Sequence, residues 1–205
     1  MTLLWHAAAP LVLASKSSAR QALLLAAGIP FDAFPASIDE REVEGPLVRS
    51  GAGAAEIALH LASAKARFIA VQYPDRLILG ADQTLSLKGS IFSKPNDLKA
   101  AAAQLSAMSG QTHELHSALC LVKGSKILFS AVPSARLTCR AFSSDFIDRY
   151  LETAGEKALS SVGAYQVEGL GIHLFDQIEG DHSTILGLPL IPLLRFLREE
   201  GSLAA

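Results

Sequence analysis

An apolar run at residues 77–81 leads directly into an acidic residue, Asp82. A carboxylate at the end of a buried strand is costly to desolvate unless a cation or hydrogen-bond donors pair with it. Asp39 and Glu40 supply further carboxylates from a different segment. Because Mg²⁺ is held by one or two carboxylates together with phosphate oxygens and water, Glu40 and Asp82 could share such an ion. The alternative is that Asp39 and Glu40 lie on a solvated loop.

Hydroxyl-bearing and basic side chains between a short apolar run and a helical pattern suit a phosphate group. The segment 14–20 reads ASKSSAR and places Ser15, Ser17 and Arg20 at the start of the predicted helix. Free backbone N–H groups at a helix N-terminus bind anions, and an arginine adds charge-assisted donors. The alternative is that the serines only cap the helix.

Two lysines could converge on the same anion. Lys94 precedes Pro95, which holds it in an extended conformation, and Lys65 lies near the end of one face of a predicted helix. Each lysine taken singly would more often be a solvated surface charge.

A glycine-rich stretch at residues 162–171, VGAYQVEGLG, could let a planar ligand approach the backbone closely. Gln166 and Glu168 offer polar groups that could read such a ligand. The alternative is a glycine-rich strand with bulges.

Composition and motifs exclude several classes of protein. The chain has 205 residues, 50% of them hydrophobic, which favours a folded α/β domain over disorder. Its 18 basic and 20 acidic side chains show no basic run, so a nucleic acid polymer is not expected as a partner. The histidines lack zinc-site spacing, and neither a GxSxG elbow nor a GxGxxG fingerprint occurs.

The cellular setting follows from the cysteines and from the apolar stretches. Cys120 and Cys139 lie on separate strand-like runs without metal-ligand spacing, which favours two reduced cysteines in a core. The apolar N-terminus lacks a basic region, and no stretch has the length of a membrane span. We therefore expect a cytoplasmic protein with no membrane partner.

Helical and strand-like patterns interleave along the whole chain, so residues 1–205 are predicted to form one domain. We expect helices where amphipathic or alanine-rich segments follow Ser, Asn or Gly and end at Gly. Alternating or continuous apolar runs predict strands, with one hairpin inside residues 84–93 around a Lys-Gly-Ser turn and a second between 113–124 and 126–142. The expected helices span about 17–28, 52–71, 96–110, 143–155 and 187–201, and the expected strands 11–14, 76–82, 84–93, 113–124 and 126–142.

Eight short motifs in a fixed order resemble the Maf family of nucleoside triphosphate pyrophosphatases. They are LASKSSARQALL, IDE, AKA, GADQ, SKP, LSAMSGQTH, GAYQVEGLG and GLPL. The resemblance covers the chain from Leu11 to about Leu197. It implies an elongated α/β domain of two lobes, related to the inosine triphosphatase type, with a bent mixed β-sheet flanked by helices and a nucleotide cleft between the lobes.

The resemblance also implies a reaction and residue roles. Water attacks the α-phosphorus of a nucleoside triphosphate, releasing the nucleoside monophosphate and pyrophosphate with Mg²⁺ or Mn²⁺ present. Asp82 would be the general base, and Glu40 would help it hold the metal. The triphosphate would be bound by Ser15, Ser17, Arg20, Lys65 and Lys94. A homodimer is suggested by the resemblance alone.

Three positions bear on the choice of base, because the family divides into a dTTP and UTP branch and a 7-methyl-GTP branch. Gln83 and Glu168 match the 7-methyl-GTP branch, and a carboxylate can accept from guanine N1–H and the exocyclic amine. Ala19 departs from that branch, which often has an aromatic residue there, and alanine cannot stack on a methylated base. The favoured substrate is 7-methyl-GTP, and dTTP or UTP is the alternative.

Two other functions stay open at this point. One is a regulator of septum formation that binds a nucleotide without hydrolysing it, but such a binder would not need the base Asp82. The other is a general phosphatase, which would release inorganic phosphate in place of pyrophosphate.

Overall fold

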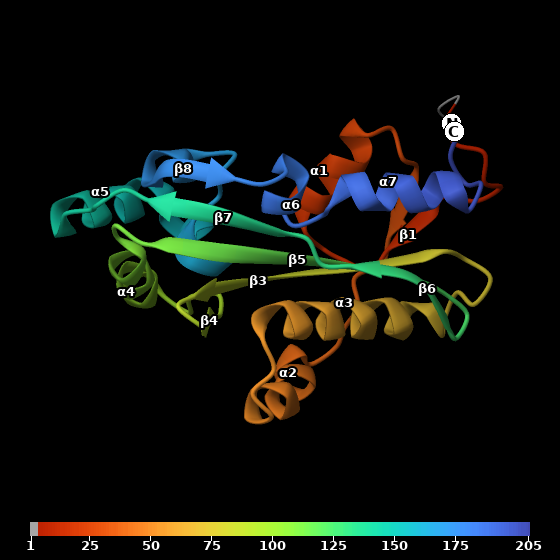
Figure 1. Cartoon of the computed structure of the whole chain (residues 1–205), viewed down its shortest axis with the longest axis horizontal. Helices are drawn as coiled ribbons and strands as arrows, with labels where there is room; N and C mark the ends of the chain where they lie inside the picture. Colours follow the sequence, from red (N-terminus) through yellow and green to blue (C-terminus); the bar gives the residue numbers. More distant parts are fainter. Residues whose placement is uncertain (1–3) are drawn as a thin grey trace. The chain divides into compact units, whose positions relative to one another are not determined.

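A computed structural model describes residues 4–205 (Figure 1). The strands form one mixed sheet of eight strands, flanked by helices, which confirms the expected α/β class. The chain divides into two compact units, and strands β3 and β5 contribute to both. The first unit comprises the chain up to Gln83, together with Ser117–Pro133 and Gly187–Ala205. The second comprises Thr84–His116 and Ser134–Leu186.

The first unit contains four helices and the strands around which they pack. Its helices are α1 (Ser18–Ala26), α2 (Glu40–Arg49), α3 (Ala54–Ala70) and α7 (Leu190–Glu199). Its strands are β1 (Leu11–Leu13), β2 (Phe31–Ala33), β6 (Lys126–Ala131), the start of β3 (Ile78–Leu87) and the end of β5 (Thr112–Lys123). β1 pairs in parallel with β2 and β3, and β6 pairs antiparallel with β5.

Helices cover both faces of the sheet in this unit, with α1 and α7 on one side and α3 on the other (Figure 1). Leu11 and Leu13 of β1 pack in the cluster with α1 and α7, whereas Val12 packs against the alanine-rich face of α3. Successive side chains of a strand point to opposite faces, so a strand covered on both sides must be apolar throughout. This explains why β1 shows no alternation in its sequence.

The second unit contains shorter elements. Its helices are α4 (Leu98–Met108), α5 (Ser144–Ala154) and α6 (His182–Ile185), with 3₁₀ turns η1 (Gly155–Leu159), η2 (Val162–Ala164) and η3 (Leu170–Leu174). Its strands are β4 (Ser90–Phe92), β7 (Ser134–Cys139), β8 (Phe175–Glu179) and the remaining parts of β3 and β5. β7 pairs antiparallel with both β5 and β8.

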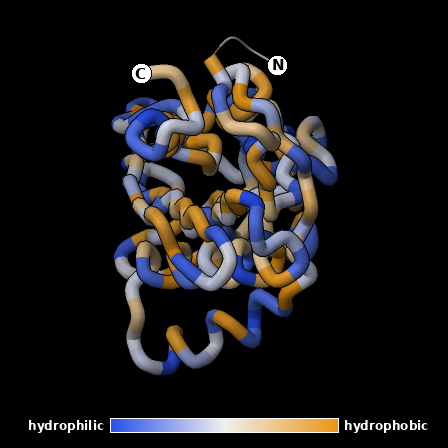
Figure 2. The backbone as a smooth tube through the Cα atoms, turned by 90° about the vertical axis from the view of Figure 1, so that its right-hand side faces the viewer, coloured by the Kyte–Doolittle hydropathy of each residue, from blue (hydrophilic) through white to orange (hydrophobic). Residues whose placement is uncertain are grey.

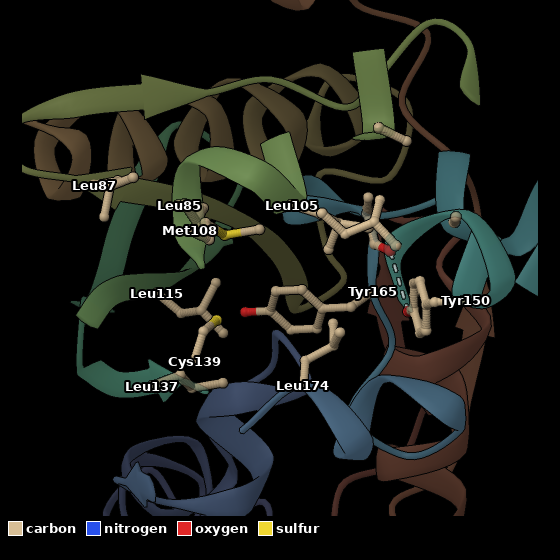
Figure 3. Close-up of a cluster of buried hydrophobic side chains, with 14 of the residues drawn as sticks. Leu85, Leu87, Leu105, Met108, Leu115, Leu137, Cys139, Tyr150, Tyr165 and Leu174 are labelled. Carbon is tan, nitrogen blue, oxygen red and sulfur yellow. Dashed lines mark hydrogen bonds between the residues drawn. The ribbon is translucent and has the colours of Figure 1, made fainter. Parts of the chain in front are cut away.

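A separate apolar core holds this second unit together. Figure 3 shows the Tyr165 ring surrounded by side chains that include Leu115, Leu137, Cys139 and Leu174. Hydrophobic and hydrophilic stretches are interspersed along the backbone (Figure 2). Such a mixture is expected of elements that are buried on one side and exposed on the other.

Most predicted elements are present, and the differences are local. Both expected hairpins form, and the cap of α1 is Ser17, one of the two serines, Ser17 and Ser18, that could have capped it. The cap of α4 is Asp97, whose carboxylate accepts from Ala100 N at 2.7 Å, and not Asn96. The glycine-rich segment forms turns and no strand, and the expected strand at 126–142 is divided into β6 and β7.

Two further observations concern the cysteines and the apolar helices. Cys120 and Cys139 are both free and buried, as expected of core cysteines. Within residues 4–205, no helix combines the length and the apolar character needed to cross a membrane.

Candidate active site

Gly80 lies two residues before Asp82 on β3 and allows helix α3 to pack closely against the strand. The two residues face the same side of the sheet because side chains alternate along a strand. Helix α3 crosses this side so closely that a Cβ on Gly80 would lie 2.0 Å from the Ala62 carbonyl oxygen. Lys65 lies one turn further along α3. The close approach of α3 to β3 therefore places the Lys65 side chain beside Asp82.

One lysine ammonium bridges two carboxylates. Lys65 Nζ donates to Asp82 Oδ1 at 2.5 Å and lies 2.7 Å from Glu40 Oε1. Asp82 is 7% exposed and Lys65 9% exposed, whereas more than half of the Glu40 side chain is exposed. The cost of burying the Asp82 carboxylate is thus offset by a buried cation. Lys65, which the sequence assigned to a phosphate, is here an ion-pair partner of the two acids.

Glu40 owes its position to helix α2, which the sequence analysis did not predict. Asp39 is the N-cap of this helix, and its carboxylate accepts from Arg41 N at 2.9 Å and Glu42 N at 3.3 Å. Such capping satisfies backbone donors that a helix otherwise leaves free. Glu40 therefore begins a helix instead of lying on the expected loop, whereas Asp39 is the last residue before the helix, and both remain exposed to solvent.

The segment before α1 forms a small network of donors and acceptors. Ser17 accepts from Arg20 N at 3.4 Å, which is the N-cap bond of the helix. Ser15 Oγ accepts from Ser17 N and from Arg20 Nη1, both at 3.2 Å. Ser15 is buried, and Ala19 lies partly exposed in the first turn of α1. The N-terminus of α1, with its free N–H groups and this arginine, can bind an anion.

Arg20 also ties this segment to the first half of β3 and to the loop before α7. Its Nη1 donates to the Ala81 carbonyl and its Nε to the Gly187 carbonyl, each at 2.8 Å. Burial lowers the pKa of Arg20 from its usual value, and the negative charges of Asp82 and Glu40 partly oppose that effect. Arg20 is therefore near the two carboxylates and is held in place by carbonyl oxygens on either side.

Two residues of this region were not selected from the sequence. Burial raises the pKa of Glu44 above its usual value, repulsion by Glu40 and Asp82 adds to the shift, and Arg41 opposes it. Glu40 and Glu44 lie four residues apart and so share one face of α2, a spacing that would have revealed Glu44 if the helix had been predicted. The other residue is Ser117, to whose Oγ Gln83 Nε2 donates at 2.8 Å.

The two remaining predicted residues belong to the second unit. Lys94 is exposed and lies two residues after β4, followed by the buried Pro95. Glu168 is exposed in a turn between η2 and η3, where Gly169 N donates to the Gln166 carbonyl at 3.1 Å. The structure therefore brings together Ser15, Ser17, Arg20, Glu40, Lys65, Asp82 and Gln83 within the first unit.

The carboxylates of Asp82 and Glu40 fit a hard divalent cation. One oxygen from each already contacts the same cationic atom, Lys65 Nζ. No group of three or more His, Cys, Asp or Glu suited to a metal occurs among residues 4–205. Two carboxylates would leave the other coordination positions to phosphate oxygens and water, as Mg²⁺ prefers.

The chain is similar to known proteins along nearly its whole length. The family Maf, described as Maf-like protein, matches residues 10–200. A protein of Rhodopseudomonas palustris (strain HaA2) named nucleoside triphosphate pyrophosphatase is 56% identical over 201 residues, which cover 98% of each chain. A protein of Rhizobium meliloti (strain 1021) named 7-methyl-GTP pyrophosphatase is 51% identical over 195 residues, covering 95% of this chain and 98% of the relative.

Proposed function

This chain belongs to the Maf family, and we propose that it hydrolyses a nucleoside triphosphate to the nucleoside monophosphate and pyrophosphate, with 7-methyl-GTP as its preferred substrate. As a nucleoside triphosphate pyrophosphatase it is a hydrolase acting on a phosphoric anhydride. The observation that supports the proposal most strongly is the buried Asp82 carboxylate, which shares Lys65 with Glu40. A general base needs such a fixed, ionised carboxylate.

In the proposed reaction the oxygen of water forms a bond to the α-phosphorus. The bond between that phosphorus and the oxygen that bridges to the β-phosphorus breaks, so pyrophosphate leaves with the bridging oxygen. Asp82 accepts the proton that the attacking water loses. Lys65 holds the carboxylate in a single orientation through its hydrogen bond to Oδ1, so the remaining carboxylate oxygen is available to the water.

We propose Mg²⁺ or Mn²⁺ as the cofactor, held by Glu40 and Asp82. The ion would supply positive charge that offsets the charge developing on the phosphate oxygens. Removing divalent ions with a chelator should abolish pyrophosphate release, and adding either ion back should restore it. Full activity in the chelator would contradict this proposal.

The phosphate groups are proposed to be bound by Ser15, Ser17 and Arg20, with Lys65 and Lys94 as further cations. The α1 N-terminus supports this role because it offers backbone donors and the Ser15 hydroxyl next to a fixed guanidinium. Preorganised donors of this kind stabilise the transition state more than the substrate, since they need not reorient during the reaction.

Glu168 and Gln83 are proposed to set the choice of base. A carboxylate at position 168 accepts from guanine N1–H and from the exocyclic amine, a donor pair that uracil and thymine do not present. A binding site that leaves polar groups unpaired with the wrong base can discriminate by about 10⁴-fold. Ala19 offers no ring for stacking, so in this proposal hydrogen bonds and not stacking carry the preference.

A cytoplasmic homodimer completes the proposal. The buried free thiols support a reducing compartment, and the dimer rests on the family alone. Light scattering of the purified protein tests the dimer, and cell fractionation tests the compartment.

The proposed function is tested by measuring pyrophosphate and phosphate release from 7-methyl-GTP, GTP, UTP, dTTP, CTP and ATP. We expect pyrophosphate as the product and the highest kcat/KM for 7-methyl-GTP. A higher kcat/KM for UTP or dTTP than for 7-methyl-GTP would place the chain in the dTTP and UTP branch of the family. Release of inorganic phosphate, or no hydrolysis of any of these nucleotides, would overturn the proposed reaction.

A further inference from the structure

His113 is almost completely buried, at 1% exposure, although it lies on a strand with two exposed neighbours. The alternation of β5 turns Thr112 and Glu114 outward and His113 inward, into the core of the second unit. A buried imidazole needs partners for its ring nitrogens. His113 Nε2 lies 2.7 Å from the Tyr165 hydroxyl, and Nδ1 lies 3.9 Å from Cys139 Sγ.

Burial keeps both partners of this pair uncharged near neutral pH. It lowers the pKa of His113 to about 4 and raises the pKa of Tyr165 well above its usual value. The neutral imidazole has one donor and one acceptor nitrogen, and a hydroxyl can serve either, so the hydrogen bond forms with either tautomer. The pair is thus a neutral, enclosed hydrogen bond, which is costly to leave half made.

Tyr165 begins the segment that carries Glu168. Its ring packs edge-on against Phe175 with centroids 5.0 Å apart, and Figure 3 shows it deep among apolar side chains. Its carbonyl accepts from Ser161 Oγ at 2.5 Å. Three residues later, Glu168 is exposed on the turn that Gln166 and Gly169 close.

The segment on either side of Tyr165 has little freedom to compensate if this residue moves. Ala164 has φ of 61°, a backbone conformation that alanine adopts only when the surroundings impose it. Its carbonyl accepts from the Tyr150 hydroxyl at 3.2 Å, the bond drawn in Figure 3. A Cβ on Gly171 would lie 2.4 Å from the Gln166 carbonyl oxygen, so the turn also closes tightly on its other side.

We propose that His113 is a positioning residue for the choice of base: through its hydrogen bond to Tyr165 it fixes the turn 165–171 and so the place of the Glu168 carboxylate. This inference rests on the proposed function of Glu168. Tyr165→Phe would keep the ring packing and remove the hydrogen bond to His113. The turn 165–171 would then keep its fold, but the position of the Glu168 carboxylate would no longer be fixed.

The test compares kcat/KM for 7-methyl-GTP and UTP in four variants. In Tyr165→Phe we expect the ratio of the two values to fall about fivefold, mainly through a higher KM for 7-methyl-GTP, with kcat on UTP nearly unchanged. Ser109→Ala is the matched control, since it removes another hydrogen bond of this unit, from Phe142 N to Ser109 Oγ, away from the turn. It should leave the ratio unchanged.

A double variant separates positioning from stability. His113→Leu combined with Tyr165→Phe removes both polar partners, so it should regain much of the thermal stability that Tyr165→Phe loses. The ratio should stay low, and amide hydrogen exchange across residues 165–171 should stay faster than in the wild type. Recovery of the ratio together with stability would overturn the proposal.

Glu168→Gln distinguishes failure of this inference from failure of the proposed function. If Glu168→Gln lowers the ratio and Tyr165→Phe does not, Glu168 reads the base but His113 does not position it. If Glu168→Gln leaves the ratio unchanged, the proposed role of Glu168 is itself wrong, and the positioning role falls with it.

Discussion

At the scale of single residues, the site depends on how one buried lysine serves two carboxylates, the buried Asp82 and the exposed Glu40. Lys65 contacts both Asp82 and Glu40, so removing any one of the three changes the balance for the other two. Breaking a buried pair by removing one partner leaves an uncompensated charge, which costs far more than the loss of an exposed pair.

Lys65→Met should therefore destabilise the protein by about 3 kcal/mol, because the Asp82 carboxylate stays buried without its cation. Arg149→Met is the matched control, since it breaks an exposed pair with Asp145. That change should cost less than about 0.5 kcal/mol. Denaturant unfolding measures both, and equal losses would contradict the account of Asp82.

The lowered pKa of His113 predicts how the stability of the folded protein depends on pH. Its pKa is about 4 in the folded protein and near 6.5 when unfolded, so between these values the unfolded chain binds more protons. Stability should therefore fall as pH is lowered from 6.5 towards 4, by about 3 kcal/mol from this group.

The variant His113→Leu with Tyr165→Phe checks this prediction, because it removes the titrating group and its partner together. Its stability should depend less steeply on pH in that window than the stability of the wild type. An unchanged slope in the double variant would show that His113 does not resist protonation.

At the scale of secondary structure, the site depends on the close crossing of α3 over β3. Only glycine at position 80 allows this approach, since any Cβ would meet the Ala62 carbonyl and the backbone nitrogen of Ala66. Lys65 lies one helical turn along α3 from that crossing point, and Asp82 lies two residues along β3 from it. Their contact is therefore a property of the two elements and not of the two side chains alone.

Gly80→Ala should separate α3 from β3, destabilise the protein by about 1–3 kcal/mol and lower kcat through the displaced Lys65. Gly45→Ala is the matched control, because this glycine lies inside α2 with room for a Cβ. That change should raise stability by roughly 0.5–1 kcal/mol. Thermal unfolding and pyrophosphate release give both readouts, and a neutral Gly80→Ala would contradict the packing argument.

At the scale of the whole molecule, the sequence predicts the elements better than their contacts. The sequence indicated a serine cap, which is Ser17, and the strand β1, because these features depend on neighbouring residues alone. Helix α2 could not be predicted from the sequence, because Gly45 and Pro46 are unfavourable inside a helix. That Lys65 pairs with Asp82, and that Tyr165 pairs with His113, depends on residues far apart in sequence, which no local pattern reveals.

The proposed choice of substrate also belongs to this scale, because Gln83 and Glu168 are distant in the chain. The double change Glu168→Gln with Gln83→Thr should shift preference from 7-methyl-GTP towards UTP and dTTP, as the donor pair of guanine loses its carboxylate acceptor. Comparison of the kcat/KM values of both single variants and the double variant measures how much Gln83 and Glu168 each contribute to the substrate preference. If the ratio stays at the wild-type value, these residues do not read the base.

The central claim is that Asp82 is the general base of pyrophosphate release, and Asp82→Asn tests it most directly. Pyrophosphate release and equilibrium binding should be measured on the nucleotide that the wild type hydrolyses fastest. The account predicts a fall in kcat of about 10²–10⁴-fold, with the fold intact and the nucleotide still bound. Hydrolysis at the wild-type rate in this variant would contradict it.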